Sequence, residues 1–247
     1  MRLSLSLLLV CISLPHLAAE TPAPEPGTQV AQHFSTTLPD GKKESLGYWL
    51  YFPKPSEADA KAKLPMVLFL HGSGERGTNL DLVKKHGPPS ILGKNKDMDG
   101  CLIASPQCPD KQWWDAKVLK LLCDDLVHRY PVDKDRIYLT GLSMGGFATW
   151  TMLAQYPRYW AAAVPICGGG EPQSAEKFKT VPIWAFHGAK DPAVPVKASQ
   201  EMIAALEKAG GKPKFTIYPN EEHQSWIPAY NDPELWTWLL SQKRSAP

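Results

Sequence analysis

A serine lies between glycines in a segment that joins a predicted strand to a predicted helix. Residues 141–146 read GLSMGG, which matches the pattern G-x-S-x-G around Ser143. A strand is predicted before this segment and a helix from residue 147 onward, the context of a strained turn that lifts a nucleophilic serine above a sheet. The glycines leave room for close backbone approach, and the start of the helix points its N–H groups toward a developing oxyanion. Because a glycine-rich turn can also hold an incidental serine, Ser143 needs a base and an acid elsewhere in the chain.

An acid and a base follow Ser143 in the order expected for such a serine. Asp191 stands in the segment HGAKDPAVP, directly after a strand predicted at residues 183–187, so it should lie near the carboxyl end of the sheet. His223 follows the last predicted strand and is the only histidine after Asp191. The order Ser, Asp, His is that of a nucleophile, an acid and a base on a mostly parallel sheet. The alternatives are an ordinary Asp-Pro turn for Asp191 and an exposed loop histidine for His223.

The loop after the strand predicted at residues 65–70 offers donors for an oxyanion. It reads HGSGERG, and we expect the backbone N–H of Ser73 to act there together with that of Met144, the residue after the serine. Gly72 and Gly74 leave space for this loop to bend toward a substrate, so we expect them to line the site.

Other polar residues of these loops are expected to have supporting roles. Glu75 and Arg76 should form an ion pair that orders the loop, with recognition of an anionic substrate by Arg76 as the alternative. His71 and His187 each end a predicted strand and precede a glycine. We expect both histidines to position backbone rather than to transfer protons.

Apolar strands and amphipathic helices alternate along the rest of the chain. The apolar run at residues 65–70 is typical of a parallel strand buried on both faces, and residues 115–130 show helical spacing that stops at Pro131. Further strands are predicted at residues 46–52, 102–105, 136–140, 161–166, 183–187 and 215–218, and further helices at residues 147–156, 196–209 and 233–242. This alternation predicts an α/β fold with a mostly parallel central sheet and helices on both faces.

The composition is that of a globular chain with nearly balanced charge. Of 247 residues, 27 are Lys or Arg and 25 are Asp or Glu, which gives a net charge of +2, and 43% are hydrophobic. These values exclude a disordered chain, a coiled coil and a multi-span membrane protein. The balance also argues against a nucleic-acid partner, which requires a basic face.

The first residues have the order of a secretory signal peptide. Arg2 precedes an apolar run of about 12 residues, which is too short to span a bilayer, and residues 17–19 offer a small-residue cleavage site. We expect residues 1–19 to be a signal peptide, residues 20–32 a linker and residues 33–247 one catalytic domain. The mature protein would be secreted or periplasmic, with no stable membrane insertion after cleavage. The alternatives are an uncleaved anchor and a lipid anchor on Cys11.

The cysteine pattern gives no sign of a metal or redox site. Four cysteines follow the predicted signal peptide: Cys101, Cys108, Cys123 and Cys167. An even number permits two disulfides in an exported protein, but a chain of this length can build its core without them. No pair has CxxC spacing. We therefore expect no metal and no cofactor, and the sequence leaves the disulfide state open.

The segments that hold these residues, HGSGERG, GLSMGG, HGAKDPAVP and EEHQSW, together resemble the α/β-hydrolase superfamily. They look most like its small carboxylesterases of the dienelactone-hydrolase and acyl-thioesterase-like branch, which includes feruloyl-esterase-like and polyhydroxybutyrate-depolymerase-like proteins. SPQCPDKQWW and SWIPAYNDPELWTWLLSQKR extend the resemblance over residues 46–244.

The resemblance implies Ser143 as nucleophile, Asp191 as acid and His223 as base, with Ser73 and Met144 forming the oxyanion hole. Dienelactone hydrolases proper use a cysteine nucleophile. Because position 143 is serine, their particular substrate is not expected here.

Two features of the sequence indicate what kind of substrate could enter the site. One is the short segment before the strand that precedes Asp191, and the other is a set of three tryptophans. Only a short segment, residues 168–180, lies between two predicted strands, so no large lid domain fits there. Trp113, Trp114 and Trp226 could line the site and would suit an aryl or sugar group, with plain packing as the alternative.

These inferences predict a secreted serine carboxylesterase that hydrolyses short-chain, aryl or sugar esters through an acyl-enzyme. Its partner would be a small-molecule or carbohydrate ester. The pattern also resembles prolyl-oligopeptidase-type enzymes, so a small serine peptidase is the first alternative, and a non-catalytic binding protein on the same fold is the second. The sequence leaves the acyl and alcohol groups, the preference for ester or amide, and the oligomeric state open.

Overall fold

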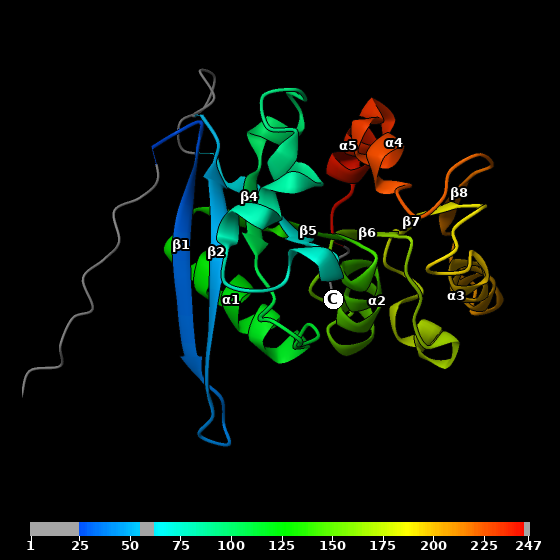
Figure 1. Ribbon diagram of the computed structural model, residues 1–247, viewed down its shortest axis with the longest axis horizontal. Coiled ribbons are helices and arrows are strands. Elements are labelled where there is room, and N and C mark those ends of the chain that lie inside the picture. The colour runs from blue at the N-terminus through cyan, green and yellow to red at the C-terminus, as the bar shows by residue number, and fades with distance from the viewer. Residues whose placement is uncertain (1–24, 55–61, 245–247) are drawn as a thin grey trace, which may run out of the picture.

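The fold is built on one eight-stranded sheet, seen edge-on across Figure 1. The computed structural model describes residues 25–54 and 62–244, so the predicted signal peptide lies outside the described residues. The strand order is β1-β2-β4-β3-β5-β6-β7-β8. The strands are β1 (Thr28–Thr37), β2 (Lys43–Phe52), β3 (Leu64–Leu70), β4 (Leu102–Pro106), β5 (Val132–Leu142), β6 (Ala162–Ile166), β7 (Trp184–Gly188) and β8 (Lys214–Tyr218).

Most of the sheet is parallel, as the sequence predicts. β1 pairs with β2, and β2 with β4, in antiparallel register, whereas the strands from β4 through β3 to β8 run parallel to one another. The carboxyl ends of the parallel strands therefore meet at one edge of the sheet. In open α/β sheets this edge is where ligands bind.

Helices cover both faces of the sheet (Figure 1). Strand β3 shows why, because Met66, Leu68 and Leu70 belong to one buried cluster while Val67 and Phe69 belong to the other. The first cluster packs under α1 (Ala116–Arg129), α2 (Met144–Gln155) and α3 (Lys197–Lys208); the second packs under α4 (Trp226–Asn231) and α5 (Pro233–Ser241). A strand whose successive side chains are all apolar must be covered on both sides.

Local signals set the ends of the helices. The Asp115 side chain accepts hydrogen bonds from the backbone N–H groups of Lys117 and Val118 at 2.8 and 3.3 Å, and so caps the start of α1. Pro131 follows the helix, as expected of a residue that cannot continue it. Asp232 caps α5 in the same way by accepting from the N–H of Glu234.

One predicted boundary is wrong. Strand β1 begins at Thr28 and pairs with β2 along its whole length, so residues 28–32 belong to the sheet and not to a linker. The strand is hard to recognise because Phe34 is the only buried residue among its ten. An edge strand with a single buried side chain carries little of the alternation that marks a half-buried strand. The predicted helices and the remaining strands are all present, with ends shifted by a few residues.

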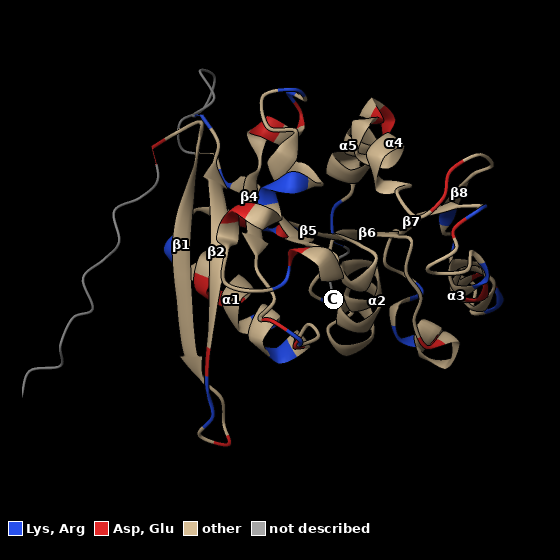
Figure 2. Cartoon of the chain, in the orientation of Figure 1, with Lys and Arg blue, Asp and Glu red and all other residues tan. Residues whose placement is uncertain are grey.

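The surface carries both signs of charge in close mixture. Lys and Arg alternate with Asp and Glu over loops and helix ends, while α2 carries no charged residue (Figure 2). Cys101, Cys108, Cys123 and Cys167 are free and buried. Among the described residues, no helix has both the length and the apolar character needed to traverse a bilayer.

Candidate active site

Ser143 stands in a strained turn between β5 and α2. Its φ and ψ are 53° and −117°, a backbone conformation that residues other than glycine rarely adopt. Its N–H donates to the Ile166 carbonyl at 3.0 Å and lies 3.3 Å from the Cys167 sulfur, so the turn is fixed to the end of β6. Strain that the surroundings hold in place is characteristic of functional positions.

The glycines on either side of this turn are required by close backbone contact. A Cβ atom on Gly145 would lie 1.9 Å from the Leu70 carbonyl oxygen, and one on Gly141 would lie 2.3 Å from the carbonyl oxygen of Gly145 itself. Real Cβ atoms essentially never approach so closely. The G-x-S-x-G pattern thus lets α2 start directly against the end of β3.

His223 connects Ser143 to Asp191. Its Nε2 lies 2.9 Å from the Ser143 hydroxyl, and its Nδ1 lies 2.7 Å from Oδ2 of Asp191. The Asp191 side chain is fully buried, and its Oδ1 accepts two backbone hydrogen bonds of 2.9 Å from Ala193 and Val194. Because Nδ1 faces a carboxylate it carries the ring proton, which leaves Nε2 free to accept the serine proton. The structure therefore brings together the three residues that the sequence singles out.

A second histidine lies behind Asp191. His187 is buried, and its Nε2 faces two acceptors, the Val194 carbonyl at 2.8 Å and Oδ2 of Asp191 at 3.3 Å. Its Nδ1 lies 2.7 Å from the Ser199 hydroxyl, which is also 2.9 Å from the carbonyl of Gly168. Burial lowers the pKa of His187, so a neutral ring with its proton on Nε2 supports the carboxylate.

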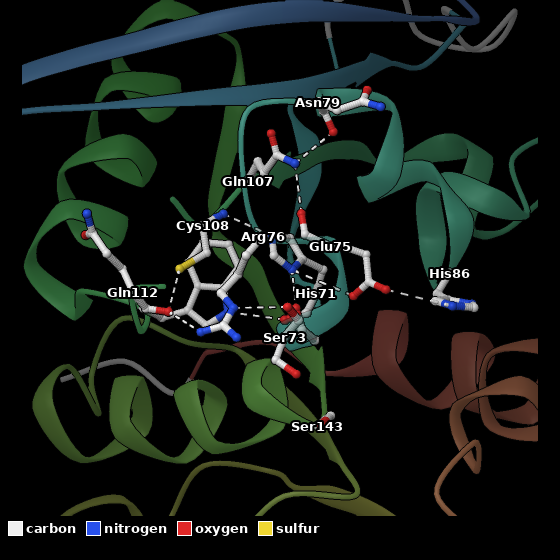
Figure 3. A network of polar contacts seen from close by, with 12 residues as sticks. His71, Ser73, Glu75, Arg76, Asn79, His86, Gln107, Cys108, Gln112 and Ser143 are labelled. Carbon is white, nitrogen blue, oxygen red and sulfur yellow. Dashed lines mark hydrogen bonds and ion pairs between the residues drawn. The ribbon is translucent and has the colours of Figure 1, made fainter. Parts of the chain in front are cut away.

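His71 orders the loop that follows β3 (Figure 3). It is buried; its Nε2 accepts the Cys108 N–H at 2.9 Å, and its Nδ1 lies 2.5 Å from the Gly72 carbonyl. Trp114 donates its indole N–H to the His71 carbonyl at 3.2 Å. Burial lowers the pKa of His71 to about 4, so the ring stays neutral. The expectation that His71 and His187 position backbone agrees with these contacts, and His187 also contacts the acid.

The expected ion pair between Glu75 and Arg76 is wrong. Arg76 instead donates from its guanidinium to two backbone carbonyls, that of Ser73 at 3.0 Å and that of Gln112 at 3.2 Å (Figure 3). The Glu75 side chain turns inward, because Ser73–Glu75 form a short 3-10 helix, and its carboxylate lies 3.8 and 3.9 Å from the rings of His71 and His86. Two neighbouring residues on such a turn point in different directions.

The loop after β3 approaches the nucleophile closely. A Cβ atom on Gly72 would lie 2.9 Å from the Leu142 side chain and 3.5 Å from that of Ser143, whereas Gly74 has no neighbour within 4 Å of such an atom. Ser73 is exposed beside it, and Met144 begins α2. The oxyanion donors assigned to Ser73 and Met144 thus stand on two segments that meet at Ser143, and their role stays a prediction.

The three tryptophans differ in their relation to Ser143 and His223. Trp226 is buried, and its ring meets that of His223 edge to face at 5.3 Å. Trp114 is half-buried and held by its hydrogen bond to His71. Trp113 is 65% exposed and meets Phe147 edge to face at 6.3 Å.

One group of side chains has the composition of a metal site. Ligand atoms of Cys167, Asp191 and His223 lie within 4.8 Å of one another. Burial raises the pKa of Cys167 to about 12, so its sulfur is a neutral thiol and a poor ligand. The carboxylate and the imidazole are already paired with each other. These residues fit proton transfer between Ser143 and His223, with Asp191 orienting the ring, better than coordination of a metal.

Gln107 is a supporting residue that the sequence did not reveal. Its side-chain amide donates to the carbonyls of Glu75 and Asn79, both at 2.8 Å, and so fixes the loop after β3 from the end of β4 (Figure 3). A glutamine after an apolar strand carries no distinctive signal, because its partners are about thirty residues away in the chain. Its role becomes visible only when β3 and β4 are paired.

The sheet order and the turn at Ser143 are those of the α/β-hydrolase fold. Residues 110–229 match the family described as "Dienelactone hydrolase family". The chain therefore has an α/β-hydrolase fold, and this part of it is similar to the dienelactone hydrolase family.

Solved structures and curated proteins include similar chains. A structure titled as a thermostable esterase superposes with a TM-score of 0.72 at 34% identity, covering 87% of this chain and 63% of that one. A ferulic acid esterase gives a TM-score of 0.64 at 14% identity, covering 86% of this chain and 98% of the other. The bifunctional acetylxylan esterase/xylanase XynS20E of Neocallimastix patriciarum is 25% identical over 207 residues, or 76% of this chain. The chain spans 28% of the length of XynS20E.

Proposed function

We propose that this chain is a serine carboxylesterase that hydrolyses short-chain, aryl or sugar esters. The observation that carries the proposal is the hydrogen-bonded series from Ser143 through His223 to Asp191, with distances of 2.9 and 2.7 Å, at the carboxyl edge of the sheet. The dienelactone hydrolase family match and the esterase relatives support an ester as substrate.

Catalysis would proceed through an acyl-enzyme. His223 takes the Ser143 proton at Nε2 while the serine oxygen attacks the ester carbonyl, and Asp191 holds the ring and stabilises the imidazolium. The backbone N–H groups of Ser73 and Met144 would donate to the oxyanion. His223 then gives its proton to the leaving alcohol, and it later activates the water that releases the acid.

Hydrolysis of p-nitrophenyl esters from acetate to octanoate tests this proposal. We expect turnover by the protein and a loss of about 10⁴-fold or more in kcat for Ser143→Ala. A fluorophosphonate that reacts with active serines should label the parent and leave Ser143→Ala unlabelled. Retained activity in the variant would remove Ser143 from the role of nucleophile, and failure of the parent to react with either reagent would favour a binding protein.

A peptidase on the same fold can be distinguished from an esterase by comparing two substrates that differ only in the leaving group. An ester and a p-nitroanilide of the same acyl group present the same carbonyl substituent to Ser143. A serine esterase should favour the ester far beyond the intrinsic difference in reactivity between the two compounds. Comparable kcat/KM values, after correction for their uncatalysed hydrolysis, would indicate the peptidase.

Export is the remaining part of the proposal. It rests on the signal pattern of residues 1–19, because Arg2, the short apolar run and the small residues at 17–19 have the order of a secretory signal. Mass spectrometry of the protein recovered outside the cytoplasm should show a new N-terminus near residue 20. An intact N-terminus on a membrane fraction would indicate an anchor instead.

A further inference from the structure

A groove of about 520 Å³ follows the exposed side of α2 away from Ser143. We propose that this α2 groove holds the carbohydrate part of a sugar ester, as a subsite for a neutral oligosaccharide on the alcohol side of the scissile bond. The inference rests on the proposed esterase function and names the substrate class of that same site. The residues that carry the argument are Trp113, Trp114, Phe147, Thr151, Gln155 and Glu171.

Both walls of the α2 groove are attached to the loops around Ser143. On one side, Phe147 lies one helical turn after the serine and donates its N–H to the Ser143 carbonyl at 3.0 Å. On the other side, Trp114 donates to the carbonyl of His71, the residue before Gly72. The groove lining therefore adjoins the two segments that hold Ser143 and the loop after β3, and we place the alcohol part of the ester along it.

The groove has the length of an oligomer rather than of a single small group. Its lining continues along α2 from Phe147 through Thr151 to Gln155. At 1.5 Å per residue these eight steps span about 12 Å. A single small alcohol group would occupy only part of this length.

The aromatic surfaces suit the faces of sugar rings. Trp113 is 65% exposed and stands edge to face with Phe147, so both rings keep apolar surface turned to the groove or to solvent. A pyranose ring presents C–H bonds on its faces, which pack against an indole, and hydroxyl groups around its rim. Aromatic walls with a few polar groups are the usual lining of a site that orients such a ligand.

The polar residues that line the α2 groove have no net charge. The Thr151 hydroxyl, which donates to the Phe147 carbonyl at 3.1 Å, keeps lone pairs for a sugar hydroxyl, and the Gln155 amide can both donate and accept. Glu171 and Lys177 contribute opposite charges to the lining. Helix α2 itself carries no charged residue (Figure 2). A neutral, hydroxyl-rich ligand fits this lining better than an anion or a purely apolar chain.

Acetylated xylose, acetylated xylotriose and p-nitrophenyl acetate test the inference, because they share one acyl group and differ in the alcohol. We expect kcat/KM to be higher for the trisaccharide than for the monosaccharide. Trp113→Ala should lower kcat/KM for acetylated xylotriose by about tenfold, chiefly through KM, and leave p-nitrophenyl acetate within about twofold. Trp113→Phe should recover part of the loss, and Gln155→Ala should affect the trisaccharide more than the monosaccharide.

Ile227→Ala is the matched control, because Ile227 is another exposed apolar side chain, 47% exposed, on α4 and outside the α2 groove. It should leave all three substrates unchanged. Equal losses on all substrates in Trp113→Ala, or none on any, would overturn the inference. So would a parent enzyme that hydrolyses p-nitrophenyl acetate but does not favour the trisaccharide. A parent that hydrolyses none of these esters would instead count against the proposed function itself.

Discussion

A His-Gly pair stands at the carboxyl end of both β3 and β7, and in each pair the histidine is fully buried and its pKa is lowered by burial. At the end of β7, His187 contacts the Asp191 carboxylate at 3.3 Å and the Val194 carbonyl at 2.8 Å. At the end of β3, the hydrogen bonds of His71 are made to backbone, to the Cys108 N–H and the Gly72 carbonyl.

The difference shows that the role of a His-Gly pair at a strand end depends on which other segment of the chain contacts the histidine. The β7 loop folds back so that Oδ2 of Asp191 lies 3.3 Å from Nε2 of His187, which places this histidine behind the proposed acid. The β3 loop meets the backbone of residue 108 instead, which couples His71 to the shape of the loop. We therefore expect changes in the β7 loop to act on kcat, and changes in the β3 loop to act first on stability.

Replacement of the Asp191 carboxylate tests the expectation that the β7 loop acts on kcat, and it has the largest expected effect. Asp191→Asn should lower kcat for p-nitrophenyl acetate by about 10⁴-fold with little change in KM, because an amide favours the wrong tautomer of His223. Glu75→Gln is the matched control, since Glu75 is the carboxylate near the histidine of the β3 loop. It should cost less than about tenfold. Similar losses in the two variants would mean that the loops do not differ in the way proposed.

Acid should destabilise the protein partly through His71. Its pKa falls from 6.5 to about 4 on folding, so the unfolded chain binds the proton more readily. The stabilisation from the neutral ring is complete above about pH 6.5 and is lost as pH falls toward 4, by about 3 kcal/mol. Urea unfolding at pH 7.5 and 4.5 should show a smaller loss for His71→Gln than for the parent. His33→Gln, at an exposed position of β1, should retain the parent's loss.

His187 should act as a positioning residue for Asp191. His187→Asn removes the Nε2 donor and should lower kcat by about tenfold at unchanged KM. His187→Gln can place an amide donor near the same position and should lose less. A fall in urea stability with kcat unchanged in both variants would reduce His187 to a packing residue, and the contrast with His71 would disappear.

Much of the candidate site could be predicted because the sequence features that mark it lie within short segments of the chain. The glycines around Ser143 and the order of Asp191 and His223 are properties of short segments, and backbone sterics dictate them. What could not be predicted depends on contacts between distant segments. Gln107 reaches the β3 loop only through strand pairing, and Glu75 separates from Arg76 because a 3-10 turn directs it inward.

Arg76 gives the smallest expected effect and the sharpest test of what the β3 loop does. Its guanidinium bridges the carbonyls of Ser73 and Gln112, a geometry that a lysine ammonium on a flexible chain cannot reproduce at both atoms. Arg76→Lys should therefore lower kcat/KM by about two- to tenfold, and by the same factor for neutral and for anionic esters, because the residue shapes the loop. The measurement compares p-nitrophenyl acetate with the p-nitrophenyl monoester of succinate. A loss confined to the succinate would instead make Arg76 a binding residue for anionic substrates. The β3 loop would then contribute to recognition as well as to shape.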